Sequence, residues 1–596
     1  MKVSLPNHKN NAFLPTSAKE VATWGWDSID VILFSGDAYV DHPSFGTAMI
    51  ARVLQANGFK VAVVPQPNWR DDLRDFKKLG KPNLFFAVTA GAMDSMVNHY
   101  TAGKRLRSND AYTPEGKAGF RPDRATVVYS KILKQLFPDV PVVIGGIEAS
   151  QRRLTHYDYW EDKLLPSILV DTQADFLVYG MAERAMVDLA KGMQQGLSTQ
   201  QLRGIKQIAY LDNNVQTPVD IELASHETCL ASKKAQAQNF RLFEEEANAY
   251  ASTKVMGQQV GNQKVIINPP YPLISTEELD ALYNLPYTRQ PHPRYKGKTI
   301  PAYEMIKYSI TMHRGCFGGC SFCTISAHQG KFIASRSEAS ILREVEKISQ
   351  DAQFKGYISD LGGPSANMYK LQGKNTELCR KCKKPACLHP VICKNLDTNH
   401  APLIDLYRKV RALPYIKKAT IGSGIRYDLA TPQYLKEVVA HHVSGRLKVA
   451  PEHTNSEVLN LMRKPSFNHF IAFEKQFREL NKACGLNQQL IPYFISSHPG
   501  CTAVHMADLA ITTKQMRFQL EQVQDFTPTP MTLSTEMYYT GLHPYTLQVV
   551  KSAKTLAQKN EQRNFFFWYK PENKQAIVRY LKQIGCAHLI AKIYPR

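Results

Sequence analysis

Short apolar runs alternate with amphipathic stretches along the first third of the chain. The apolar runs predict five buried strands, and the stretches between them predict helices near 44–57, 124–136 and 183–195. The predicted strands are Val31–Phe34, Val61–Val64, Leu84–Val88, Val140–Ile144 and Phe176–Tyr179. Continuous apolar strands that alternate with helices are typical of a parallel sheet covered on both faces. The pattern therefore predicts an α/β fold that begins with a doubly wound parallel sheet.

The same alternation resumes near residue 303 and predicts a partial (βα)6 barrel of the TIM type. Its six expected strands are Ile306–Met312, Gly356–Asp360, Lys418–Gly422, Arg446–Ala450, Gln489–Ile495 and Met531–Leu533. Helices are expected at Ser337–Ser349, Pro402–Leu413, Pro432–His441, Asn455–Met462 and Phe467–Ala483. Barrel chemistry lies at the carboxyl ends of the strands, so the functional residues are expected there.

These patterns predict four parts of the chain. They are a flavodoxin-like N-terminal domain (1–215), a Pro-rich connector (216–302), a barrel (303–535) with a Cys-rich insertion (374–400), and a small helical C-terminal extension (536–596). The first 25 residues are expected to form a loosely ordered arm.

The composition is that of a globular protein with a basic surface. The 596 residues are 43% hydrophobic, 10% aromatic and 21% charged, which excludes a disordered or fibrous protein. They carry 74 Lys and Arg against 52 Asp and Glu, a net charge of +22. No apolar run is long enough for a membrane span, and the N-terminus lacks the apolar core of a secretory signal. We therefore expect a cytoplasmic protein without a membrane partner. The positive net charge favours binding of a polyanion such as RNA. A basic surface that contacts only solvent would have the same net charge.

Seven of the 11 cysteines fall into two clusters. Clustered thiols in a long chain without a secretory signal indicate metal ligands rather than disulfides. The first cluster, Cys316, Cys320 and Cys323, lies on a glycine-rich loop directly after a predicted strand. Three thiolates can bind three irons of a [4Fe–4S] cube and leave the fourth iron open to chelate S-adenosylmethionine (SAM). Zinc is the alternative, with His313 or His328 as a fourth ligand.

The second cluster is Cys379, Cys382, Cys387 and Cys393, in a polar and basic segment with too little apolar content to fold without a metal. Four cysteines within 15 residues suit either zinc or a second [4Fe–4S] cluster. Only one Cys-x2-Cys pair is present, and the compact spacing favours iron and sulfur.

The sequence resembles the YgiQ-type family of radical SAM proteins along almost its whole length. The motifs that carry the resemblance are residues 36–46, 144–153, 156–160, 314–323, 360–369 and 528–532. The loop 316–323 also matches the radical SAM signature, three cysteines with an aromatic residue before the last. The resemblance implies a [4Fe–4S] cluster, SAM and an electron donor such as flavodoxin or ferredoxin. It leaves the substrate open.

The resemblance also implies roles for residues around SAM. In this superfamily the aromatic residue before the last cysteine packs by the adenine, and Phe322 matches it. Gly362 and Gly363 match the glycines that hold the SAM amino group after the second strand. Polar residues after the third and fourth strands hold the ribose and carboxylate, and the matching candidates are Ser423, Arg426 and Glu452. Arg426 could equally pair with a structural acid.

The N-terminal domain resembles the cobalamin-binding domain that precedes many radical SAM barrels. The cobalamin motif Asp-x-His-x-x-Gly is not matched by the segment Asp41 to Gly46, so we do not expect cobalamin. His42 in that segment is as well explained by a role at the start of a helix.

Together these observations predict a radical SAM enzyme that forms a 5′-deoxyadenosyl radical, with RNA modification as the leading function. Two alternatives remain. One is a radical SAM enzyme that acts on a small metabolite or a peptide. The other is a zinc-stapled RNA-binding or regulatory protein without turnover. No residue is assigned as a catalytic acid or base.

Overall fold

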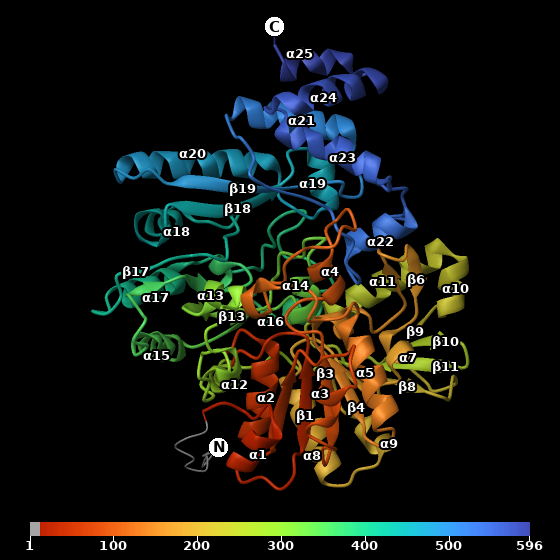
Figure 1. Cartoon of the computed structure of the whole chain (residues 1–596). Coiled ribbons are helices and arrows are strands. Elements are labelled where there is room, and N and C mark those ends of the chain that lie inside the picture. The colour runs from red at the N-terminus through yellow and green to blue at the C-terminus, as the bar shows by residue number, and fades with distance from the viewer. Residues whose placement is uncertain (1–11, 596) are drawn as a thin grey trace.

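A nine-stranded sheet organises the N-terminal half of the computed structural model, which describes residues 12–595 (Figure 1). Five of its strands pair in parallel, in the order β2-β1-β3-β4-β7. They are β1 (Val31–Ser35), β2 (Val61–Pro65), β3 (Phe85–Thr89), β4 (Val142–Gly145) and β7 (Phe176–Val178). This is the flavodoxin-like strand order, in which ligands bind beyond the carboxyl ends of the strands. The fold is therefore α/β, as predicted.

Helices cover both faces of this sheet because successive strand residues point to opposite sides. Val31 and Leu33 pack with α2 (Gly46–Ala56) and α8 (Glu183–Gln194). Ile32 and Phe34 pack in a second core with the helices of the opposite face. Those helices are α5 (Ala125–Leu136) and α7 (Ile168–Thr172). Both faces are thus buried, which explains the unbroken apolar runs of the strands.

The sheet continues past the predicted first domain. After β7 follow β8 (Ile208–Asp212), β11 (Gln263–Ile267), β10 (Met256–Val260) and β9 (Ile221–Leu223), with antiparallel pairings at β7-β8, β8-β11 and β11-β10. Three of these strands come from the predicted connector, which also contributes α10 (His226–Ala231), α11 (Lys233–Ala247) and α12 (Thr276–Tyr283). The division of the chain into domains stays a prediction.

The second half places short parallel strands in the order expected of a partial barrel. They are β12 (Ser309–Thr311), β15 (Tyr357–Ile358), β16 (Asp360–Gly362), β17 (Lys418–Ala419), β18 (Arg446–Glu452), β19 (Gln489–Ser496) and β20 (Gln522–Asp525). They pair as β12-β16, β15-β17 and β18-β19-β20. The predicted strand Met531–Leu533 is wrong: the last strand is β20, and Thr532 caps helix α22 (Leu533–Thr540).

Helices follow the barrel strands and complete the C-terminal end. The barrel helices are α15 (Glu338–Ser349), α17 (Ala401–Arg411), α18 (Pro432–Glu437), α19 (Ser456–Leu461), α20 (Phe467–Ala483) and α21 (Ala503–Gln515). The C-terminal extension contains α23 (Leu556–Asn564), α24 (Pro571–Gln583) and α25 (Ile590–Ile593), at the opposite end of the molecule from the nine-stranded sheet (Figure 1). Within residues 12–595 no helix is long and apolar enough to cross a membrane.

The two halves meet at the carboxyl edge of the nine-stranded sheet. Arg314 on β13 (His313–Arg314) donates to Glu183 on α8 at 2.7 Å, and both side chains are buried. Burial of an ion pair is favourable only when both charges stay partnered, so this contact fixes the barrel against the sheet. It also brings the first cysteine loop, which starts at residue 315, to the boundary between the halves.

Candidate functional site

The first cysteine loop runs from β13 to α14 (Thr324–Gln329) and is held by its own backbone. Gly315 has φ +86°, and a Cβ there would lie 2.1 Å from the carbonyl oxygen of Phe332. Only glycine fits that position. The Cys316 N–H donates to the carbonyl of Gly330 at 3.1 Å. The loop therefore has a single conformation that its glycine permits and its hydrogen bonds maintain.

The three thiols of this loop lie close to one another. Burial, and then the neighbouring thiols of Cys320 and Cys316, raise the pKa of Cys323 to about 12. Arg426 contacts the same group, with Nη1 3.6 Å from the Sγ of Cys320. No group of three or more His, Cys, Asp or Glu side chains in residues 12–595 is arranged to hold a single metal ion. The donor set suits a cube, whose thiolates are spread over separate irons.

The guanidinium of Arg426 is not free: it contacts both Asp428 and Cys320. Its Nε and Nη2 donate to the two carboxylate oxygens of Asp428 at 2.8 and 2.7 Å, and its remaining nitrogen faces Cys320. The paired Asp428 raises the pKa of Arg426 despite its burial, so the charge is fixed. A fixed positive charge beside a thiol stabilises the thiolate form that binds metal. Asp428 was missed in the sequence, although it lies two residues from Arg426.

Glu452 lies at the carboxyl end of β18, near Cys323. Its φ is +68°, an uncommon backbone conformation for glutamate, and its side chain is buried. Burial raises the pKa of Glu452, and the Lys464 ammonium, 4.0 Å away, opposes that rise. The residues near the thiols thus include two carboxylates, Asp428 and Glu452, and two cations, Arg426 and Lys464. Lys464 was missed because it follows a helix rather than a strand.

The predicted glycine turn lies beside a buried histidine. A Cβ on Gly363 would lie 2.5 Å from the His313 ring, and one on Gly362 would lie 2.1 Å from the Ser423 hydroxyl. Ser423 also donates to the carboxylate of Asp360 at 3.1 Å. The structure therefore brings three of the predicted SAM residues, Gly362, Gly363 and Ser423, to one corner.

Phe322 does not belong to that corner. Its ring meets the ring of His498 edge to face at 6.1 Å, and it lines a separate cavity of about 440 Å³ with Asp525 and Phe526. The Ser321 carbonyl accepts from the N–H of Ser534 at 2.9 Å, which ties this side of the loop to α22. The packing of Phe322 against adenine stays a prediction.

A cavity of about 530 Å³ separates the nine-stranded sheet from the barrel. Its lining combines glycine-rich turns at the carboxyl ends of β3, β4 and β7 with barrel residues that include Gly362, Gly363, His313 and His328. Within the described chain, both ring nitrogens of His313 and Nδ1 of His328 lack hydrogen-bond partners although they are buried. Because unpaired buried nitrogens are costly, these atoms indicate where a ligand would be bound. Neither histidine lies on the thiol loop as a zinc ligand would.

The segment from Asp41 to Gly46 is mainly structural. Asp41 pairs with Arg52 on α2, and His42 Nδ1 accepts from the N–H of Ser44 at 3.1 Å. His42 therefore shapes the turn that starts α2. Its neighbours Pro43 and Ser44, rather than His42, line the cavity.

The second cysteine group lies on an exposed loop beside the first. Cys379 is on α16 (Thr376–Arg380), and the loop from Cys382 to Cys393 follows it. The pKa of Cys379 is raised by burial and by the thiols of Cys382 and Cys393, so these groups are neighbours. Both cysteine sets that the sequence singled out are thus gathered in space.

Comparison with known proteins identifies the same two halves. Residues 13–309 match the family described as Radical SAM N-terminal, 310–492 match the Radical SAM superfamily, and 521–592 match a domain of unknown function. A protein of Porphyromonas gingivalis named UPF0313 protein is 59% identical over 99% of this chain and 95% of its own length.

One solved structure shares the fold at low sequence identity. The radical SAM methyltransferase TsrM from Kitasatospora setae, with tryptophan and a SAM analogue bound, gives a TM-score of 0.51 at 13% identity. The match covers 95% of this chain and 98% of that enzyme. Another structure of TsrM, with cobalamin and a [4Fe–4S] cluster bound, covers 85% of this chain and 74% of its own, at 15% identity and a TM-score of 0.49.

Proposed function

Because this chain belongs to the UPF0313 (YgiQ) family of radical SAM proteins and is an enzyme, we propose that it cleaves SAM reductively at Cys316, Cys320 and Cys323. The observation that carries the proposal is the gathering of these three thiols on a loop that glycine keeps tight. Cys316, Cys320 and Cys323 would hold a [4Fe–4S] cluster, which would supply the one electron that cleaves the SAM sulfonium to methionine and a 5′-deoxyadenosyl radical.

The residues around the thiols fit an anionic cluster. Arg426 faces Cys320 at 3.6 Å, and its pairing with Asp428 fixes its position. Lys464 lowers the pKa of the Cys316 thiol against the rise that burial causes. These two cations stabilise thiolates in a site with little solvent, where charge interactions are strong.

The corner of Gly362, Gly363 and Ser423 supports binding of the SAM amino acid moiety. The glycines let the backbone approach the His313 ring and the Ser423 hydroxyl closely, and the Asp360 carboxylate lies behind the serine. A carboxylate and backbone groups at this corner can accept hydrogen bonds from an ammonium group. His313 stays neutral because burial lowers its pKa to about 3, so it adds no positive charge there.

The radical would act on a group that enters the cavity between sheet and barrel. For the substrate we propose RNA, which the net charge of +22 favours. A small metabolite is the second candidate, because the cavity of about 530 Å³ lies between the two halves rather than along a basic groove. Both place the reacting carbon near Gly363 and His313.

Two further expectations remain proposals. Free thiols in two clusters suit a reducing compartment, so we place the protein in the cytoplasm. The expectation that the N-terminal domain binds no cobalamin gains no support from the comparisons, and the cavity at the sheet edge leaves space for a second organic ligand.

Cleavage of SAM is tested with protein purified without oxygen, reduced with dithionite and analysed for 5′-deoxyadenosine. Wild type should form it, and Cys316→Ala should reduce the yield by more than about a thousandfold, because the cluster loses a ligand. Cys484→Ala, at an exposed cysteine after α20, is the control and should match wild type. Iron-loaded wild type without product, or an active Cys316→Ala protein, would contradict the proposal. Total cellular RNA should raise the yield, and ribonuclease treatment should abolish that rise; a rise that survives digestion supports a small molecule.

A further inference from the structure

The thiols of the second loop form one group with an all-sulfur donor set. The N–H of Cys382 donates to the carbonyl of Cys379 at 3.1 Å, and the N–H of Cys393 donates to the carbonyl of Cys387 at 2.8 Å. The side chain of Asn395 donates to the Sγ of Cys379 at 3.3 Å, a contact that suits a thiolate. Four cysteines on one short loop can hold a four-iron cube, one thiolate to each iron.

This second loop is packed directly onto the first one. The N–H of Cys387 donates to the carbonyl of Phe317 at 2.9 Å. A Cβ on Gly319 would lie 2.6 Å from the Cβ of Ala386, so the two backbones touch. Cys316 and Cys387 both pack against one apolar cluster, whose buried members are Phe317, Met368, Leu371, Leu388, Leu396 and Leu429. The two cysteine loops are therefore in direct backbone contact, and Cys316 and Cys387 share one apolar cluster.

The outer side of the second loop is exposed and basic. Residues 374–397 contain six basic and two acidic side chains. All six basic residues are exposed, and they are Lys374, Arg380, Lys381, Lys383, Lys384 and Lys394. Among them Leu378 and Val391 expose 56% and 75% of their surface. Exposed apolar side chains among mainly basic ones are typical of a surface that binds an acidic protein.

From these observations we propose that Cys379, Cys382, Cys387 and Cys393 hold a second iron–sulfur cluster, which receives electrons from an acidic one-electron carrier protein that docks on this basic surface. The inference rests on the proposed SAM cleavage, which consumes one electron per turnover. The reduced carrier, of the ferredoxin or flavodoxin class, loses one electron, the second cluster transfers it, and the cluster at Cys316 gains it. No atom or proton moves in this step. The basic surface thus serves the carrier rather than RNA.

The metal is tested on the full chain by iron and sulfide analysis after anaerobic reconstitution. We expect about eight irons in wild type and about four in Cys382→Ala/Cys393→Ala, because a cube that loses two of four ligands is not retained. Electron paramagnetic resonance of the reduced proteins should show two interacting clusters in wild type and one in the variant. Cys484→Ala should match wild type. Zinc in the second loop, or about four irons in wild type, would overturn the inference.

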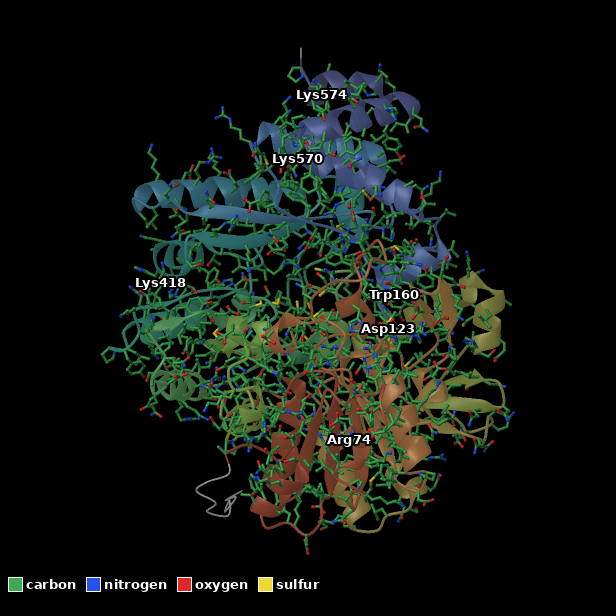
Figure 2. The ribbon with its side chains drawn as sticks, in the orientation of Figure 1. Arg74, Asp123, Trp160, Lys418, Lys570 and Lys574 are labelled. Carbon is green, nitrogen blue, oxygen red and sulfur yellow. The ribbon has the colours of Figure 1, made fainter. Side chains whose placement is uncertain are left out.

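The role is tested by comparing SAM cleavage driven by reduced ferredoxin with cleavage driven by dithionite. The ratio of the two rates should fall more than about tenfold in Cys382→Ala/Cys393→Ala and about tenfold in Lys381→Glu/Lys383→Glu, the latter because charge reversal slows docking. Lys570→Glu/Lys574→Glu is the matched control, since both lysines lie at the C-terminal end of the molecule (Figure 2), and should keep the wild-type ratio.

The outcomes separate the two proposals. Dithionite-driven cleavage reports the Cys316 site alone, so its absence from iron-loaded wild type contradicts the proposed function. A normal dithionite rate with an unchanged ratio in both variants overturns the second-cluster inference only. Loss of RNA binding in Lys381→Glu/Lys383→Glu, with the ratio unchanged, would assign the surface to RNA instead.

Discussion

The two cysteine loops use the same ligand type in opposite surroundings. In the first loop Gly315, Phe317, Gly318, Gly319 and Ser321 are buried, and the chain has almost no freedom there. In the second loop most residues between 374 and 394 are exposed and many are charged. Under the two proposals above, the buried loop suits radical chemistry, which needs water excluded, and the exposed loop suits the docking of a carrier protein.

The largest effect should come from crowding the first loop. Gly315→Ala introduces a Cβ at a φ of +86° and 2.1 Å from the Phe332 oxygen. We expect a loss of about 4 kcal/mol in the free energy of unfolding, from backbone strain and overpacking together. Iron content and urea unfolding measure it, and the first cluster should be lost while the second remains.

Gly25→Ala is the control for that substitution. Gly25 also has a positive φ, +68°, but a Cβ there would meet no atom within 4 Å. Its cost should be about 1 kcal/mol, from strain alone. Equal losses in the two variants would show that the first loop is not the tightly packed element described above.

A smaller effect concerns the pH dependence of stability at α22. This helix contacts the first loop through the hydrogen bond from Ser534 to Ser321. Glu536 on α22 is buried, and burial raises its pKa from 4.5 to about 7, with Gln236 as hydrogen-bond donor. The folded chain holds the proton more tightly than the unfolded chain. Stability therefore falls, by on the order of 3 kcal/mol, as the pH rises from 4.5 to about 7. Glu536→Gln should remove this dependence in urea unfolding at pH 5 and pH 8; an unchanged slope would contradict it.

The smallest effect concerns access to the thiols in metal-free protein. Cys393 is exposed, whereas Cys323 is half-buried with its pKa raised to about 12. Because the thiolate is the reactive form, Cys393 should be alkylated by iodoacetamide at least about tenfold faster than Cys323. Peptide mass spectrometry gives both rates in one sample, with exposed Cys484 as the internal reference. Similar alkylation rates for Cys393 and Cys323 would contradict the difference in burial between the two loops.

The sequence predicted the elements whose pattern is local. The five parallel strands of the first sheet were found within two residues of their ends, because each is apolar along its whole length. The last barrel strand was missed because β20 reads Gln-Val-Gln-Asp and has no apolar run. The extension of the sheet was missed for a similar reason, since β10 contains two glutamines.

The sequence likewise predicted those parts of the candidate site that have a local pattern. Cysteine spacing is local, so both thiol sets were found from the sequence. The partner of Arg426, the position of Lys464 and the cavity beside His313 depend on residues far apart in the chain, and no pattern along the sequence encodes such contacts. Phe322 shows the reverse case, since its motif position is clear but its ring faces another cavity.

All nine strands of the sheet beside the cavity come from one continuous part of the chain. The last of them ends at Ile267, well before Cys316. During synthesis these nine strands leave the ribosome before any cysteine of either cluster, so this half can fold without iron. Chains made without iron would therefore keep an ordered N-terminal half, because none of its nine strands contains a cysteine of either cluster.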